Sequence, residues 1–363
     1  MINYLKFLIT KYRIHHLIRY FFSKNKFDYH FIESNVDLKI TSLLIKKYKN
    51  KILENKNKNS KLWDQILNKK YHDLYSAIEI NDVKCTSIIL SKFFRDKCIR
   101  GAEDGDLFKN PILNVSHKQL ILEGILALAH YDGILDYPAP YQVNNYKHSQ
   151  TNYVKLYNKI SKKFPLKTIP NYGSPYGLNV GNGVINHRFI ESLFLNLELK
   201  NILTNFNFST KNKLNFLEIG GGSGLNALNL FFFFKGNIKK IYLVDLPQML
   251  IFQEYLIRST LKKSELRYFE FISNSDFEKA NIKYDVMINK DSIPEINKKE
   301  SLKYIQNFSK SKNSLFFSLN HESRSFKQNP VKELISKFKN ISVVSRDYSK
   351  IKEGYIKEIY ISN

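Results

Sequence analysis

The chain has 363 residues, of which 43% are hydrophobic and 14% aromatic, and its 57 basic and 33 acidic residues give a formal charge of +24. This composition excludes a disordered chain, and the length is sufficient for two domains with a sizeable core. Because the lysines are spread along the whole chain, the charge does not predict a specific nucleic-acid site, although it suits an anionic substrate such as a nucleotide sugar.

The two cysteines, Cys85 and Cys98, form no C-x-x-C pair. We therefore expect no disulfide framework, no metal site and a reducing, cytoplasmic location. The stretch Met1–Phe22 is apolar but interrupted by basic residues, so it lacks the run of about twenty apolar residues that spans a membrane. It has no small-residue cleavage site, and it is predicted either to pack on the protein or to make a peripheral membrane contact as a basic helix.

Helical patterns fill the first 200 residues. Residues 1–60 are predicted to form a basic helical extension with little chemistry, ending in a solvated connector at Asn55–Lys61. Residues 61–200 are predicted to form a helical substrate or lid domain. In this domain Trp63 is expected to anchor the core, and His117–His130 is expected to be the buried central helix.

A further predicted helix, Gln142–Phe164, precedes a segment rich in turn residues. Tyr172–Phe189 contains four glycines, one proline and three asparagines, so we expect no regular element there. Two interpretations remain open: the segment covers a cofactor and presents groups to an acceptor, or it is a linker between domains. A helix over Arg188–Leu203 then leads into the last domain, residues 201–363.

The most informative stretch is Leu214–Leu230, LNFLEIGGGSGLNALNL. Its first residues are typical of a buried parallel strand and its last ones of a helix, with a glycine turn between them. Glycines allow the backbone to turn sharply and approach a ligand, and the amides at the start of the following helix point toward that ligand. The pattern therefore predicts a nucleotide-type binding site at the carboxyl end of a strand.

Two cofactors use such a loop. From Glu218, the residues Gly220, Gly222 and Gly224 complete E-x-G-x-G-x-G, the first motif of S-adenosylmethionine-dependent methyltransferases. From Gly222, the same residues satisfy the looser dinucleotide pattern G-x-G-x-x-A. The carboxylate of Glu218 favours the first interpretation, because it attracts a cationic sulfonium and repels a pyrophosphate.

A second acid, Asp245, ends the next predicted strand, Ile241–Val244, with Leu246 directly after it. A carboxylate at this position can accept hydrogen bonds from both ribose hydroxyls of either cofactor. We therefore predict that Glu218, Asp245 and Leu246 border one cofactor cavity.

Seven strands are expected in the last domain. Strands alternate with helices until the final two runs, which have no helix between them and are predicted to pair antiparallel. The fold class predicted is α/β, with a Rossmann-like, doubly wound seven-stranded sheet whose last strand is antiparallel, preceded by an α-helical N-terminal domain. The strands are expected at Leu214–Ile219, Ile241–Val244, Leu266–Ile272, Tyr284–Asn289, Leu315–Leu319, Ile341–Val344 and Ile356–Ile361.

These motifs together resemble the bacterial sugar O-methyltransferase family of class I S-adenosylmethionine-dependent enzymes. The resemblance covers about Tyr172–Asn320 and is carried by the glycine loop, by D-L-P at Asp245, by N-x-x-S-x-x-E from Asn289 to Glu295, and by Asn320 closing the fifth strand. It implies a sugar hydroxyl or glycan as the acceptor. The sequence departs from the family's aromatic-Gln-Glu-Met motif at residues 293–296, which are Ile-Pro-Glu-Ile.

The resemblance also implies roles for individual residues. Methyltransferases often place an acid on the adenine amine and an apolar side chain on its ring, and Asp276 and Phe277 occupy that place after the third strand. Transfer to a hydroxyl needs a proton acceptor, for which His321, Asp291 and His187 are the candidates. A last set of residues is expected to contact the cofactor or to orient acceptor hydroxyls: Asn289, Ser292, Glu295 and Asn320.

Several alternatives stay open at this stage. An NAD-dependent sugar oxidoreductase or epimerase uses a similar loop, and a non-catalytic domain could keep the cofactor site. Asp291, Glu295 and Glu322 offer oxygen ligands, but their spacing is not diagnostic, so no metal is assigned. A base-methylating enzyme would favour D/N-P-P-Y/F after the fourth strand, which Asn289-Lys-Asp-Ser292 is not.

Overall fold

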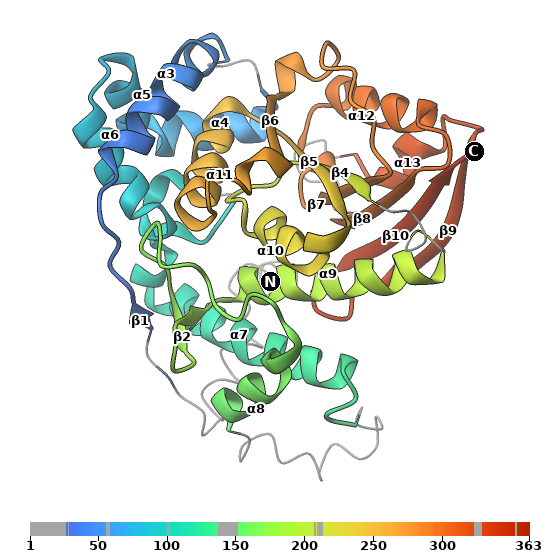
Figure 1. Cartoon of the computed structure of the whole chain (residues 1–363), viewed down its shortest axis with the longest axis horizontal. Helices are drawn as coiled ribbons and strands as arrows, with labels where there is room; N and C mark the ends of the chain where they lie inside the picture. The colour runs from blue at the N-terminus through green and yellow to red at the C-terminus, as the bar shows by residue number, and fades with distance from the viewer. Residues whose placement is uncertain are drawn as a thin grey trace, which may run out of the picture.

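The computed structural model describes residues 27, 29–55, 59–99, 102–136, 152–206, 208, 213–322, 329–352 and 354–363. Its centre is a seven-stranded sheet of order β6-β5-β4-β7-β8-β10-β9 (Figure 1). The strands are β4 (Leu214–Ile219), β5 (Ile238–Asp245), β6 (Phe269–Ser273), β7 (Val286–Lys290), β8 (Leu315–His321), β9 (Ile341–Tyr348) and β10 (Tyr355–Ser362).

The direction of the strands confirms the predicted fold class. Strands β6, β5, β4, β7 and β8 pair in parallel, whereas β10 pairs antiparallel with both β8 and β9. The order reverses at β4, because the chain first builds outward through β5 and β6 and then returns to the other side through β7. Ligand sites in open α/β sheets lie at such a switch point, beyond the carboxyl ends of the strands.

Apolar side chains of the sheet alternate between two hydrophobic clusters, one on each face. Phe216 belongs to one cluster and Leu217 to the other, as the two-residue period of a strand requires. The first cluster includes residues of α9 (His187–Asn205), α10 (Leu225–Phe234) and α11 (Pro247–Thr260) and extends into the helices of the first 200 residues. The second cluster contains residues of α12 (Lys298–Lys310) and α13 (Val331–Ile335). Helices on both faces explain why these strands are almost continuously apolar.

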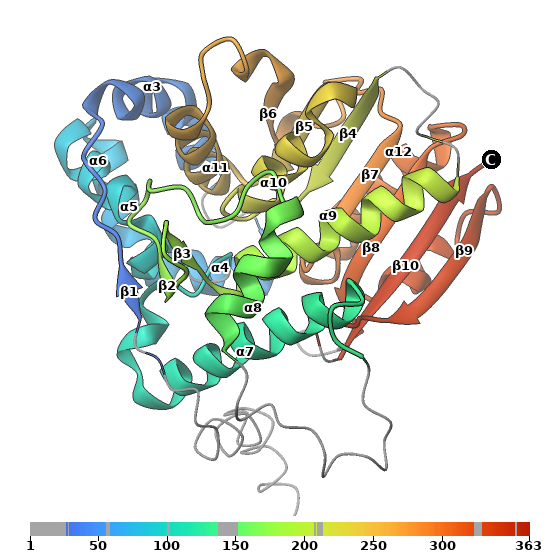
Figure 2. The same cartoon turned by 60° about the horizontal axis from the view of Figure 1, so that its bottom comes forward.

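The helical half of the molecule lies beside the β6 edge and below the sheet in Figure 1. Helix α9 packs against both α7 and α10 and so joins this half to the sheet (Figure 2). The other helices are α3 (Leu38–Glu54), α4 (Lys61–Lys70), α5 (His72–Glu79), α6 (Val83–Ser91), α7 (Pro111–Tyr131) and α8 (Tyr153–Ile160).

Helix α3 is held on α11 by a buried acid. Glu254 of α11 has no exposed surface, and its carboxylate accepts hydrogen bonds from Tyr48 and Lys47, with a Lys47 Nζ to Oε2 distance of 2.6 Å. Because residues 38–54 form α3, their predicted helical character is confirmed. The Met1–Phe22 stretch, with its predicted membrane contact, lies outside the described residues.

Helix α7 confirms the predicted buried helix and extends it toward the N-terminus. Asn110 caps it by accepting hydrogen bonds from the backbone of Ile112 and Leu113, and Pro111 occupies the first turn. Of the predicted helix Gln142–Phe164, α8 forms the described central part, and residues 142–151 lie outside the described ranges.

The expectation that Tyr172–Phe189 contains no regular element is wrong. Strands β2 (Tyr176–Asn179) and β3 (Val184–Ile185) form a hairpin, and β1 (His30–Phe31) pairs with β2. Glycine makes this possible: Gly177 approaches the backbone of Ile185 so closely that a Cβ would lie 2.0 Å from its carbonyl oxygen. The turn residues thus define a compact hairpin.

The third and fourth strands begin later than predicted. A 3₁₀ turn at Leu266–Tyr268 precedes β6, which starts at Phe269 and not at Leu266.

Among the described residues, no helix combines the length and apolarity needed to cross a membrane.

Candidate functional site

A cavity of about 440 Å³ opens at the carboxyl ends of β4, β5 and β7. This volume is in the range of small-molecule sites. The sheet contributes one wall, and the helical half contributes the facing wall through the end of α3, the start of α4, residues 102–103 and α9. The cavity therefore lies at the switch point of the sheet, where the sequence predicts a ligand site.

The glycine turn has the conformation that the motif predicts. Gly220, Gly222 and Gly224 have φ angles of +72°, +59° and +88°, which side-chain-bearing residues rarely adopt. A Cβ on Gly220 would lie 2.2 Å from Ser292 Oγ, so the loop after β7 depends on glycine at this position. Gly224 begins α10, and Gly220 and Gly222 line the cavity directly.

Glu218 and Asp245 line the same cavity, as the sequence predicts. Glu218 is 3% exposed; its Oε1 accepts a hydrogen bond of 2.7 Å from Asn226, and its Oε2 has no hydrogen-bond partner in the described part of the chain. Asp245 Oδ2 accepts hydrogen bonds from the Gly222 amide and from Gln253. Burial raises the pKa of each carboxyl to about 7.

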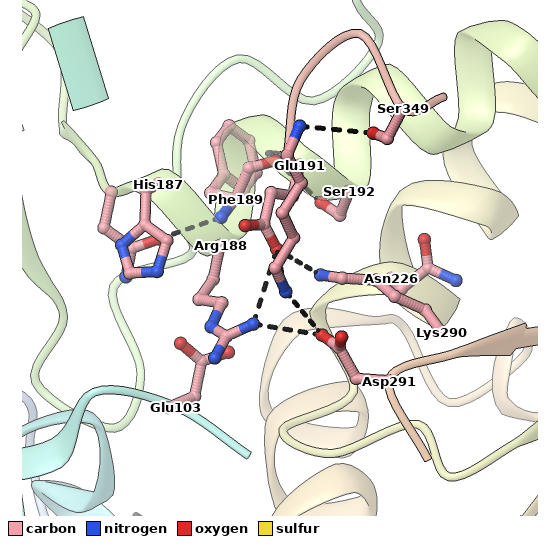
Figure 3. A network of polar contacts seen from close by, with 12 residues as sticks. Glu103, His187, Arg188, Phe189, Glu191, Ser192, Asn226, Lys290, Asp291 and Ser349 are labelled. Atoms are coloured by element: carbon pink, nitrogen blue, oxygen red, sulfur yellow. Dashed lines mark hydrogen bonds and ion pairs between the residues drawn. The ribbon is translucent and has the colours of Figure 1, made fainter. Parts of the chain in front are cut away.

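A dense charge network lies next to these acids (Figure 3). Glu191 of α9 is 2.7 Å from Lys290 and 3.4 Å from Arg188, and Asp291 is 3.2 Å from Arg188 and 2.8 Å from Lys352. Burial alone would raise the pKa of both acids, but the three neighbouring cations hold the pKa of Glu191 and of Asp291 below its ordinary value. These carboxylates are therefore ionised and paired.

Three more predicted residues line the cavity: Leu246, Ser292 and Glu295. Asn289 does not line it, because it is buried below the loop, where its side chain donates to the Ile219 carbonyl and contacts Ser292. Asn320 is also buried and donates to Ser318. These two residues are placed to hold the walls rather than to contact a ligand.

Asp276 and Phe277 do not line the cavity either. The 3₁₀ turn after β6 directs Asp276 to Ser273 and Lys51, and Phe277 packs on Tyr304 in the second hydrophobic cluster, with ring centroids 4.8 Å apart. Asn274 and Ser275, the preceding residues, line the cavity in their place. The residues that line the cavity after β6 thus lie two positions earlier in the chain than the predicted pair.

The three candidate proton acceptors have different surroundings. Asp291 lines the cavity but is engaged by Arg188 and Lys352. His187 is the first residue of α9 and is buried beside Asp104, off the cavity lining. His321 ends β8, and its Nε2 lies 3.8 Å from Oε1 of Glu295, which lines the cavity.

Sequence analysis missed the residues that close the cavity. Asn55, Asn59, Ser60 and Trp63 line it, so three residues of the predicted solvated connector, Asn55, Asn59 and Ser60, pack at the cavity and are only partly exposed. Ser60 caps α4 by accepting from the Trp63 amide, which fixes the first turn against the cavity. The lysine- and asparagine-rich composition gave no signal for this packing.

Sequence analysis also missed Glu103, which lines the cavity. Ser223 of the glycine loop donates a hydrogen bond of 2.5 Å to its Oε1, while its Oε2 has no partner in the part of the chain that is described. Burial raises the pKa of Glu103 to about 7. Two adjacent acids between glycines, GAEDG at residues 101–105, were the available signal.

Comparison with known proteins gives little beyond the geometry. No family model matches the chain, and no curated protein matches it. Among solved structures, mitomycin 7-O-methyltransferase MmcR matches at 11% identity and a TM-score of 0.33, over 42% of this chain and 50% of that one. Magnesium protoporphyrin IX methyltransferase from Synechocystis PCC 6803, with bound SAM, matches at 14% identity and a TM-score of 0.36, over 50% of this chain and 87% of that one.

The chain thus aligns with only about half the length of MmcR. A third structure, LepI in complex with SAM, matches at 16% identity and a TM-score of 0.33, over 42% of this chain and 43% of that chain. Because all these scores are low, the function of the chain has to be argued from its strand order and its cavity.

Proposed function

We propose that the protein is an S-adenosylmethionine-dependent O-methyltransferase and that its acceptor is a hydroxyl of a sugar, in a nucleotide sugar or a glycan precursor. The observation that carries the proposal is a pair of carboxyls, the buried Glu218 and the partly exposed Asp245, which line one cavity beside a turn of bare backbone. A buried acid without a full set of partners is best satisfied by a cationic ligand.

The strand order supports the same cofactor. The classical dinucleotide fold has the order 3-2-1-4-5-6, whereas here the antiparallel β10 is inserted between β8 and β9. A pyrophosphate at the glycine turn would also lie beside Glu218, which has no arginine or lysine among its hydrogen-bond or ion-pair partners in the described part of the chain. Both observations favour the methyl donor over NAD.

The residues present fit the proposed cofactor. Glu218 is placed to face its positive charge, Asp245 its ribose hydroxyls, and Asn274 and Ser275 its base, while Gly220 and Gly222 leave room for close approach. When bound, S-adenosylmethionine supplies an electrophilic methyl group on a positively charged sulfur. The protein's task is then to align an acceptor oxygen with this methyl group and to remove its proton.

Among the candidates, His321 is the proton acceptor that we propose. Asp291 is a poor base because its cationic neighbours lower its pKa, and His187 is buried beside Asp104. Neither His187 nor His321 lines the cavity, but His321 Nε2 lies 3.8 Å from Oε1 of Glu295, which does. Ser292, Glu295, Asn297 and Glu300 line the cavity, and such hydroxyl, amide and carboxylate groups suit a polyhydroxylated acceptor.

The cofactor is tested by titrating the purified protein calorimetrically with S-adenosylhomocysteine and, separately, with NAD. We expect binding of the first and not of the second; the reverse result would refute the proposal. Gly222→Arg, which puts a large cation into the glycine turn, is expected to abolish binding. Gly236→Arg is the matched control, because a side chain at Gly236 meets no atom within 4 Å and the residue has no positive φ.

The acceptor is tested by incubating the protein with S-adenosylmethionine and a panel of nucleotide sugars and glycans. The masses of the products are then measured by mass spectrometry. We expect one product heavier by one methylene. In His321→Gln the turnover should fall by about 10²–10⁴ while S-adenosylhomocysteine affinity is unchanged. Unchanged turnover would remove His321 from the mechanism without affecting the assignment of the cofactor.

A further inference from the structure

Three side chains from separate parts of the helical half meet behind the cavity wall. Asp104 lies just before the 3₁₀ turn Gly105–Lys109, His117 is on α7 and His187 begins α9. Oδ2 of Asp104 is 2.9 Å from Nδ1 of His117 and 3.2 Å from Nδ1 of His187. The three potential ligand atoms all lie within 4.8 Å of one another.

The cluster is buried but not fully satisfied by hydrogen bonds. Asp104 is 5% exposed and His187 is 7% exposed. Although His187 Nδ1 is close to the carboxylate, the geometry makes no hydrogen bond, and this atom has no other partner among the residues described. This buried nitrogen is therefore left without a hydrogen bond, whereas a simple hydrogen-bonded triad would have used it.

We propose that Asp104, His117 and His187 bind a Zn²⁺ ion. Bonds of about 2.1 Å to nitrogen and oxygen, meeting at tetrahedral or octahedral angles, place neighbouring ligand atoms about 2.9–3.4 Å apart, and the two observed separations lie in this range. Two imidazoles and one carboxylate are donors that suit zinc, and three protein ligands leave a position for water.

The site would support the wall of the cavity without taking part in methyl transfer. None of its three ligands lines the cavity, but Glu103 and Arg188, the neighbours of Asp104 and His187 in the sequence, both do. An ion at this point would bind residues 102–105 to α7 and α9 and so fix the positions of Glu103 and Arg188. Sequence analysis expected no metal, because the three ligands share no local spacing.

The experiment measures zinc in the full-length protein by plasma mass spectrometry after purification without a histidine tag. We expect about one zinc per chain in the wild type, and less than a tenth of that in Asp104→Asn and His117→Gln. The control is His72→Gln, an exposed histidine of α5, which should keep the wild-type content. Equal zinc in wild type and Asp104→Asn would overturn the proposal, because the ion would then lie elsewhere.

A second measurement keeps the test independent of whether the variants fold. The wild type is stripped with a chelator, and its melting temperature is recorded before and after addition of Zn²⁺ or Co²⁺. We expect the melting temperature to rise on adding Zn²⁺, since a ligand of the native state stabilises it, and visible Co²⁺ absorption bands at one equivalent. No bound zinc, no change in melting temperature and no cobalt bands would overturn the proposal. Titration with S-adenosylhomocysteine is a separate readout, so this result does not depend on the proposed function.

Discussion

Two groups of acids in and beside the cavity behave in opposite ways: those at the glycine turn, and the paired end formed by Glu191 and Asp291. At the glycine turn, desolvation raises the pKa of Glu218 and Asp245 to about 7. At the paired end, Glu191 is buried and Asp291 is partly exposed, and Lys290, Lys352 and Arg188 hold the pKa of each below its ordinary value. Desolvation acts to raise the pKa in both groups, so the difference comes from the cations. The negative charge at the glycine turn is therefore available to a cationic ligand, whereas the negative charge of Glu191 and Asp291 is already neutralised by these three cations.

The largest expected effect is at the paired end. Glu191→Gln removes one carboxylate from three cations and leaves Asp291 alone to face them, so it should lower the free energy of unfolding by about 3–5 kcal/mol. Denaturant unfolding at pH 7 measures this loss. Glu198→Gln, on the same helix and ion-paired with Lys357, is the control and should cost about 1–2 kcal/mol. Equal losses in the two variants would mean that the network adds nothing beyond a single pair.

The same type of substitution at the glycine turn should have an effect of opposite sign on the free energy of unfolding. Glu218→Gln removes a buried charge that makes no ion pair within the described part of the chain and keeps an acceptor for Asn226, so it should stabilise the unliganded protein by about 1–3 kcal/mol at pH 8. It should also weaken S-adenosylmethionine binding by about ten- to a hundredfold, because a charge-assisted contact is lost. Glu270→Gln on the exposed surface of β6 is the control for removal of one negative charge. A destabilised Glu218→Gln with wild-type affinity would contradict the comparison.

The pH dependence follows from the raised pKa values. Folding raises the pKa of Glu218 and Asp245 above that of the unfolded chain, so their contribution to stability is complete below about pH 4 and is lost as the pH rises through about 7. The melting temperature of the unliganded protein should therefore fall between pH 5 and pH 8, and fall less in Glu218→Gln. Affinity for S-adenosylmethionine should change in the other direction and increase over the same interval, as the carboxylates ionise. Calorimetric titrations at pH 6 and pH 8 measure it, and tighter binding at pH 6 would exclude a cation-binding role.

The smallest effect is expected at Asp276. Its ion pair with Lys51 is partly exposed, so Asp276→Asn should cost less than about 1 kcal/mol of stability. Because Asp276 does not line the cavity, S-adenosylhomocysteine affinity should stay within about twofold of the wild type. A tenfold loss would show that Asp276, as sequence analysis proposed, contacts the cofactor after all.

The accuracy of the sequence predictions differed between the two halves for a physical reason. Glu218 and Asp245 lie at the carboxyl ends of β4 and β5, and the glycine turn follows β4 directly. Parallel strands bring their carboxyl ends to one edge of the sheet, so connectivity alone places these residues together. Connectivity alone did not indicate that the 3₁₀ turn after β6 brings Asn274 and Ser275, and not Asp276, to the cavity lining. The covering residues Asn59, Trp63 and Glu103 come from segments whose position depends on how helices pack.

By itself, the sequence determined the doubly wound sheet with its antiparallel last strand, the glycine turn and the two acids beside it, because hydrophobic periodicity and backbone sterics act over a few residues. Only the tertiary structure decided which acids are neutralised, which segments close the cavity, and that Asp104, His117 and His187 meet. Such encounters depend on packing between residues far apart in the chain, and the charge of a neighbour then decides whether a buried carboxyl is a structural ion pair or a place for a ligand.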